Sequence, residues 1–152
     1  MMIRFLYTFW ILIFSLSSLA DNVPPKVAEE FVKAYTSPTG SKLSINDLQS
    51  LEKLNIVGSA AKNIYKMTLS NGEHVILKDL KEDKYASELD NLLRIEPFLT
   101  TYAEKATKDM PQFARYRGHF ILEGGLSDRD QTTHHIILFD EASGLSLFDW
   151  LE

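Results

Sequence analysis

The Ser-Asn-Gly turn at positions 70–72 constrains the fold of this chain more than any other feature. It separates two stretches that are rich in apolar and β-branched residues, 63–69 and 73–78. Asn-Gly between two such stretches is a strong signal for a β-hairpin, because both residues accept the positive φ angles of a tight turn. Another apolar stretch, at 54–57, precedes the hairpin. We therefore expect three consecutive antiparallel strands at 54–57, 63–69 and 73–78.

Apolar residues recur at helical spacing on both sides of this hairpin. Before it, they predict a helix at 25–35, and Ser44 with Asp47 predicts the capped start of a second short helix or turn. After it, they predict a helix that breaks or kinks at the residue before Pro97, followed by a second helical piece at 98–108.

Two more strands are expected later in the chain, GHFILEGGL at 118–126 and HHIILFDEA at 134–142, and the final residues resemble the start of a helix. Because strands and helices are segregated along the chain, we predict an α+β fold. It would contain a five-stranded antiparallel sheet with a helix packed on it, preceded by short helices. Four phenylalanines are expected to fill the core: Phe31, Phe98, Phe113 and Phe120.

The composition excludes several classes of protein. The 152 residues are 45% hydrophobic and 24% charged, which fits one globular domain. The absence of cysteine excludes a disulfide framework and a thiolate metal site. The net charge of −5, without clusters of Lys and Arg, argues against binding to nucleic acid or to an anionic membrane. His134 and His135 are neighbours on a predicted strand and would point to opposite faces, so we expect no metal site there.

The first twenty residues have the pattern of a secretory signal peptide. One positive charge at Arg4 precedes an apolar run, and small residues end the segment at Ala20. The apolar run at 5–16 is shorter than the roughly 20 residues that span a bilayer. We expect cleavage after Ala20 and a secreted or periplasmic protein. The alternative is an uncleaved N-terminal anchor, which would be the only attachment to a membrane.

Four motifs accompany the predicted elements in order: VGSAAKNIYK at 57–66, VILK at 75–78, SELDNLLRI at 87–95 and IILFDEASGLSLFDWL at 136–151. With the order of three strands, a helix, two strands and a linker, they resemble the small N-terminal lobe of the protein-kinase-like superfamily. The resemblance fits either the protein kinases or the choline-kinase and aminoglycoside-phosphotransferase branch. It covers most of the predicted mature chain.

The resemblance implies a site for the phosphates of ATP. Lys78 would hold phosphate, and Glu88 on the next helix would orient Lys78, with Glu82 and Glu96 as alternative carboxylates. The loop between the first two strands would cover the phosphates through its backbone N–H groups. This loop consists of Gly58, Ser59, Ala60 and Ala61. It keeps only one of the usual glycines, and an ordinary hairpin turn is the alternative interpretation.

The resemblance also implies an adenine site. Ile64 and Ile76 would line it, although kinases usually have alanine at the position of Ile76. Phe139 would be the gatekeeper, the residue that closes the back of the adenine pocket. The hinge, Asp140, Glu141 and Ala142, would offer the carbonyl of Asp140 and the N–H of Ala142 to the base. The alternative is a strand that runs into a capped helix.

These 152 residues contain no catalytic loop or metal-binding Asp motif, so we expect them to lack the large lobe that completes a kinase. They would be either the front piece of a longer or interrupted reading frame or a stand-alone remnant. The predicted organisation is a signal peptide at 1–20, a helical extension at 21–53, a small lobe at 54–142, and a hinge with the start of a large-lobe helix at 143–152. We expect an exported, truncated kinase-like protein that binds ATP but is inactive alone, with Mg²⁺ bound only if a large lobe is present. Since ATP is scarce outside cells, a bacterial effector that acts inside a host would fit.

Two alternatives remain open. One is a non-catalytic exported α+β module that binds a protein partner through its sheet face or an exposed strand edge. The exposed apolar underside of the lobe is a further possible surface for a protein partner. The other is a degraded kinase-like scaffold without affinity for nucleotide.

Overall fold

The protein is an α+β fold built on one open, five-stranded antiparallel sheet, as the sequence predicted. The computed structural model describes residues 23–55, 63–107, 109–110, 112–126 and 131–141. The elements in chain order are α2 (Pro25–Ala34), the 3-10 turn η1 (Ile45–Asp47), β1 (Leu48–Leu54), β2 (Ile64–Leu69), β3 (His74–Lys81), α3 (Glu82–Lys105), β4 (Tyr116–Glu123) and β5 (Thr133–Asp140). No helix among the described residues is both long and apolar enough to cross a membrane.

The strands are arranged in the order β1-β2-β3-β5-β4, with every neighbouring pair antiparallel. The predicted hairpin joins β2 and β3, and Gly72 has a φ of 85° in its turn. The N–H of Gly72 donates to the carbonyl of Leu69 at 2.9 Å, and the Asn71 side chain accepts from the N–H of Glu73 at 2.9 Å. The turn is therefore built by the local chemistry that its sequence predicted.

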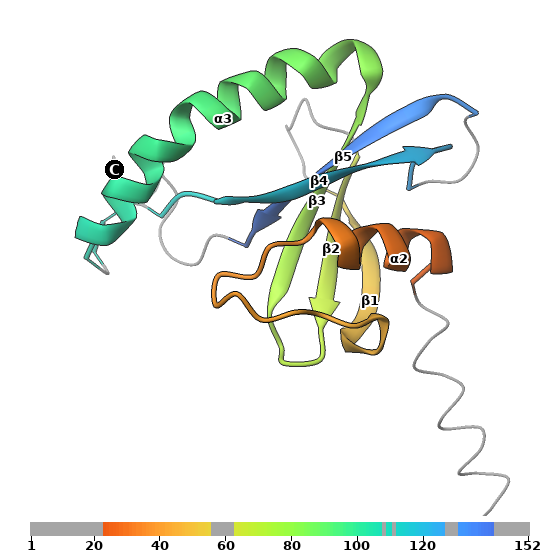
Figure 1. The fold of residues 1–152 in the computed structure, drawn as a ribbon, viewed down its shortest axis with the longest axis horizontal. Helices are drawn as coiled ribbons and strands as arrows, with labels where there is room; N and C mark the ends of the chain where they lie inside the picture. The colour runs from red at the N-terminus through yellow and green to blue at the C-terminus, as the bar shows by residue number, and fades with distance from the viewer. Residues whose placement is uncertain (1–22, 56–62, 108, 111, 127–130, 142–152) are drawn as a thin grey trace, which may run out of the picture.

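The two helices lie on opposite sides of the sheet (Figure 1). Side chains alternate between faces along a strand, so Leu77 and Lys78 point in opposite directions. Leu77 lies in the core with Phe31 of α2, whereas Lys78 contacts α3. The main core thus lies between α2 and the sheet, and α3 packs on the other side.

Close approach of α2 to β4 depends on Gly118. This residue has a φ of 135°, and a Cβ placed on it would run into the backbone carbonyl of Ala34. The N–H of Thr36, just after the helix, donates to the carbonyl of Arg117 at 2.8 Å. Of the four phenylalanines expected in the core, Phe31 and Phe120 are buried, but Phe98 is 76% exposed and Phe113 is 41% exposed.

The first strand corrects the prediction. It spans Leu48–Leu54 rather than 54–57, of which residues 56 and 57 lie outside the described part. All of the strand except Leu54 therefore lies in 21–53, the range expected to be helical. The register shifts between Leu48 and Ser50 where β1 pairs with β2. This bulge places Leu48 and Leu51 against the same core, although a regular strand would turn residues three apart to opposite faces. A spacing of three between apolar residues is typical of a helix, so the sequence pattern favoured a helix here.

One turn of the predicted short helix does form before this strand. The carboxylate of Asp47 accepts hydrogen bonds from the backbone N–H of Ser44 at 2.7 Å and from its hydroxyl at 2.9 Å. These bonds, the one from the backbone first, lower the pKa of Asp47 below its ordinary value.

Of the predicted break or kink at Glu96, the break is wrong. α3 is one helix of 24 residues with Pro97 inside it, and it curves along its length (Figure 1). Proline removes the N–H that would bond to the carbonyl of Leu93. Both Pro97 and Leu93 are exposed, so water can satisfy that carbonyl and the helix continues.

Candidate functional site

The centre of the candidate site is an ion pair between the sheet and α3. Lys78 is on β3 and donates a hydrogen bond from Nζ to Oε1 of Glu88 on α3, and both side chains are partly buried. Of the two candidate carboxylates whose side chains are described, Glu88 is the one that contacts Lys78. Glu96 pairs with Arg115 instead, and the side chain of Glu82 lies outside the described part.

Apolar side chains surround Lys78 on its face of the sheet. Lys78 is the register partner of Ile64 on β2 and of Ile137 on β5. In the next row, Ile76 is the partner of Phe139. Partners across strands share a face, so Ile64, Ile76 and Phe139 lie on the same face as Lys78. The three residues predicted to line an adenine site are thus brought together beside the lysine.

The first residue of the predicted hinge, Asp140, has its side chain bound to Arg117. Arg117 donates two hydrogen bonds to the carboxylate of Asp140. One runs from Nε to Oδ1 at 2.7 Å and the other from Nη2 to Oδ2. The hydrogen bond to Asp140 raises the pKa of Arg117 above its ordinary value and outweighs the effect of burial. The N–H of Asp140 donates to the carbonyl of Arg115 at 2.9 Å. The predicted contact with adenine uses the carbonyl of Asp140, and it stays a prediction.

Two hollows lie around the end of β5. One has a volume of about 330 Å³ and is lined by Tyr35, Pro38, Gly72, Glu73, His74, Asp140 and Glu141. Burial, followed by the charges of Asp140 and Glu73, raises the pKa of Tyr35 there. The other, of about 180 Å³, is lined by Leu99, Tyr102, Ala103, Gln112, Phe113, Arg115, Asp140 and Glu141. Neither of these two hollows is lined by Lys78 or Ile76.

The remaining predicted site residues cannot be placed against this geometry. The loop residues Gly58, Ser59, Ala60 and Ala61 and the hinge residue Ala142 lie outside the described residues. Their roles stay predictions.

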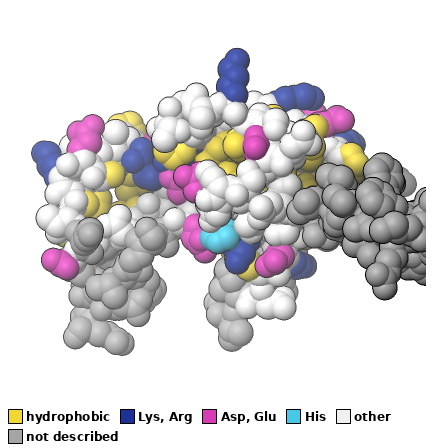
Figure 2. Space-filling model, turned by 90° about the horizontal axis from the view of Figure 1, so that it is seen from below, with side chains coloured by type: hydrophobic (Ala, Val, Ile, Leu, Met, Phe, Trp, Pro, Cys, Tyr) yellow, Lys and Arg dark blue, Asp and Glu magenta, His cyan; other side chains and the backbone are white. Residues whose placement is uncertain are grey.

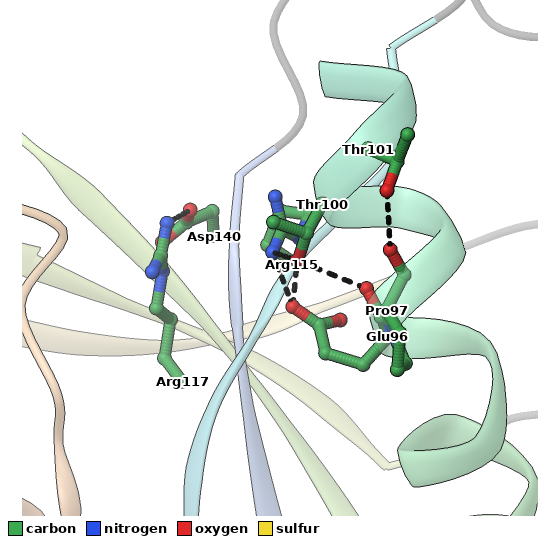
Figure 3. A network of polar contacts seen from close by, with 7 residues as sticks. All are labelled: Glu96, Pro97, Thr100, Thr101, Arg115, Arg117 and Asp140. Atoms are coloured by element: carbon green, nitrogen blue, oxygen red, sulfur yellow. Dashed lines mark hydrogen bonds and ion pairs between the residues drawn. The ribbon is translucent and has the colours of Figure 1, made fainter. Parts of the chain in front are cut away.

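A polar network around Arg115 was not foreseen from the sequence. Figure 3 shows Arg115 pointing at Glu96 and Thr100 of α3, while Arg117 points away from the helix toward Asp140. Arg115 is 19 residues from Glu96, and Arg117 is 23 residues from Asp140. The only sequence signal was two arginines spaced by two near the start of a strand, a spacing that would place both on one face of a regular strand. Arg115 instead lies before β4, and the pairing of β4 shifts between Tyr116 and Gly118, so the two side chains point to different sides.

A second unforeseen cluster lies on the core face of the sheet. The carboxylate of Asp79 makes two hydrogen bonds. Its Oδ1 bonds to Nδ1 of His134 at 2.5 Å, and its Oδ2 accepts from the N–H of Leu126 at 3.0 Å. His134 Nε2 contacts the hydroxyl of Thr132 at 3.1 Å. Both Asp79 and His134 are buried, so this cluster fastens β3, β5 and the turn after β4.

The two adjacent histidines do point to opposite faces, as predicted. His134 lies in the Asp79 cluster, whereas His135 stacks on Tyr85 of α3 with ring centroids 3.7 Å apart. Within the described part of the chain, no three metal-binding side chains gather in a way that could hold an ion. On the face that Figure 2 shows, Lys and Arg side chains are scattered among acidic and apolar ones.

A scan against protein-family models found no family that matches the sequence, and a search of curated proteins found no match. The kinase-like resemblance therefore rests on the motifs of the sequence and on the contacts described above.

Proposed function

We propose that this chain supplies the ATP-binding small lobe of an exported kinase-like phosphotransferase and is inactive without a large lobe. The observation that carries the proposal is the pairing of Lys78 on β3 with Glu88 on α3. In kinases, a strand lysine held by a helix carboxylate positions an ammonium group for the α- and β-phosphates of ATP.

The chemistry of the described residues suits the two parts of a nucleotide. The ammonium of Lys78 is partly exposed and provides donors for phosphate oxygens. Beside it, the apolar side chains of Ile64, Ile76 and Phe139 suit the flat face of a base. Ile76 is larger than the alanine usual in kinases and would narrow the space for adenine. Mg²⁺ would neutralise phosphate charge, and its protein ligands would come from a large lobe.

The proposal includes export, on the basis of the signal-like residues at 1–20, and an acceptor hydroxyl on a protein or a small alcohol. An exported protein would meet little ATP outside the cytoplasm, so the proposal includes action inside another cell.

Binding of a non-hydrolysable ATP analogue, measured by isothermal titration calorimetry, tests the proposal. We expect Lys78→Met to weaken binding by about 10- to 100-fold, because hydrogen bonds to charged groups contribute about 1.5–3 kcal/mol. Glu88→Gln should weaken it less, since Lys78 keeps its charge. Lys33→Met is the matched control, because Lys33 forms an exposed ion pair with Glu30 on α2. If the unmodified chain and the Lys78 variant both fail to bind, the nucleotide site is excluded.

A non-catalytic module that binds a protein partner is the second candidate. Three large apolar residues of α3 are exposed: Leu93, Ile95 and Phe98. Neighbouring exposed apolar side chains are typical of protein-binding surfaces. Binding of the ATP analogue that depends on Lys78 would favour the first candidate over this one.

A further inference from the structure

The long helix that carries Glu88 is fastened to the rest of the protein at both ends. In its first half, Tyr85 stacks on His135 and Glu88 pairs with Lys78. In its second half, the contacts come from the segment that leads into β4, where Phe113 meets Tyr102 edge-on with ring centroids 5.2 Å apart. Contacts made by the second half can act on Glu88 only through the stretch of helix that joins the two halves.

The join between the two halves is weakened at Pro97. Proline inside a helix removes one hydrogen bond of the ladder and crowds the carbonyl four residues earlier, at a cost of about 3 kcal/mol. α3 nevertheless continues through Pro97 without interruption. The hydroxyl of Thr100 donates to the carbonyl of Glu96 at 3.0 Å, and the hydroxyl of Thr101 donates to the carbonyl of Pro97 at 3.1 Å. These short bonds follow the backbone around the proline but do not connect the helix to the sheet.

Arg115 supplies that connection, and it does so on both sides of Pro97 (Figure 3). Its Nε and Nη2 donate to Oε1 of Glu96 at 2.8 and 2.5 Å, just before the proline. Its Nη2 also donates to the hydroxyl of Thr100 at 2.7 Å, just after it. The backbone carbonyl of Arg115 accepts from the N–H of Asp140, so Arg115 is itself anchored to the end of β5.

Burial separates this ion pair from an ordinary surface pair. The side chains of Arg115 and Glu96 are 21% and 23% exposed. The pair between Arg94 and Asp90 lies on the same helix with side chains 74% and 59% exposed. Exposed pairs contribute little, because water screens the charges and two long side chains must be ordered. The Arg94 pair is therefore a control for the Arg115 pair within the same helix.

We infer that Arg115 is a positioning residue. By binding α3 on both sides of Pro97, it keeps the helix rigid there and holds Glu88 against Lys78. A guanidinium can hold two partners because its donors are arranged in a rigid fork, which a lysine lacks. The geometric part of this inference is independent of the function proposed above. Only its effect on nucleotide affinity rests on that function.

The geometric part is tested with spin labels, which is convenient because the chain has no cysteine of its own. One labelled pair, Asn91→Cys with Glu104→Cys, spans Pro97 at two exposed positions. An unbroken helix predicts about 20 Å between their backbones. A second pair, Asn91→Cys with Glu52→Cys, measures the first half of α3 against the sheet.

We expect both distance distributions to be narrow in the parent chain and to broaden in Arg115→Gln. Thr100→Val removes only the contact after the proline. It should broaden the distance distribution of the first labelled pair less than Arg115→Gln does. Arg94→Gln should leave both pairs unchanged. Unchanged distributions in a folded Arg115→Gln protein would overturn the inference. Broadening of the first pair alone would show that Arg115 stiffens the helix without positioning Glu88, which also overturns it.

Affinity for the ATP analogue tests the consequence for the site. Arg115→Gln should weaken binding by at least about fivefold, the lower end of coupling between separate sites. Arg115→Lys keeps the charge near Glu96 and should recover part of the loss, whereas Arg94→Gln should bind as the parent does. A parent chain that does not bind the analogue rejects the proposed function but leaves the distance measurements to decide on Arg115. Equal affinities of the parent and Arg115→Gln would overturn the positioning role.

Discussion

Lys78 and Asp79 are neighbours on β3 and point to opposite faces of the sheet, one to Glu88 of α3 and the other to His134 of β5. The candidate site is therefore only one residue away from a buried polar cluster. That cluster holds β3 against β5 where Lys78 must be placed. Stability of the sheet and geometry of the site are linked through this pair of adjacent residues.

Asp79→Asn should destabilise the fold strongly. The carboxylate is buried, and it serves both His134 and the N–H of Leu126. A buried polar group that loses its hydrogen-bond partner typically costs about 1–3 kcal/mol. Urea unfolding followed by circular dichroism measures this change. Asp90→Asn, at an exposed position on α3, should change the midpoint little, and equal midpoints for the two variants would contradict the role of Asp79.

Phe31→Ala should separate α2 from the sheet. Phe31 is fully buried in the core beneath α2, and truncation of a buried phenylalanine typically costs about 3–5 kcal/mol. Phe98→Ala is the matched control, because that side chain is 76% exposed. Thermal unfolding should show a large drop in the melting temperature for the first variant only. A similar drop for both would mean that Phe98 is buried in solution.

Gly118→Ala should be more harmful than the same change at Gly40. Both glycines have positive φ angles, but only at Gly118 would a new Cβ meet the backbone of Ala34. The added methyl at Gly40 meets open space, so that variant reports backbone strain alone. Chemical denaturation of both variants gives the extra cost of displacing α2. If Gly40→Ala is equally destabilising, close approach of α2 to β4 is not the reason for the glycine.

Asp47 should contribute to loss of stability in acid. Its pKa is lowered in the folded state, so its contribution is present above the unfolded pKa, about 3.9, and disappears as the pH falls through the lower folded value. Asp47→Asn should therefore be less stable than the parent at neutral pH, and the difference should shrink below about pH 4. Urea midpoints at pH 7 and pH 3 measure both.

Ser44→Ala provides a companion to that experiment. It removes the hydroxyl but keeps the backbone N–H, which is the larger cause of the lowered pKa. Its pH dependence should thus stay close to that of the parent. A pH dependence that matches Asp47→Asn would assign the effect to the hydroxyl instead.

The parts of the fold that sequence predicted are those with a local cause. Asn71 and Gly72 form the hairpin between β2 and β3 because the turn chemistry lies within the turn itself. The contact between Lys78 and Glu88 was expected from the resemblance to a kinase-like small lobe, and the two side chains do meet.

The parts that it missed depend on geometry elsewhere in the molecule. The bulge at the start of β1 gives Leu48 and Leu51 a helix-like spacing, and only pairing with β2 reveals a strand. Proline usually ends a helix. Here the helix is exposed at Pro97, and Arg115 binds residues on both sides of the proline. The partners of Arg115 and Arg117 are distant in sequence, so no local pattern identifies them.

The same bulge affects how the molecule behaves at high concentration. Within the described part of the chain, β1 and β4 are the outermost strands, and no further strand pairs with their outer sides. A regular edge is a template on which other chains can add strands and build fibrils. The pairing of β1 is offset near Leu48, and that of β4 is offset near Tyr116, so each border is uneven. Such offsets hinder an incoming strand from pairing along the whole length of these borders.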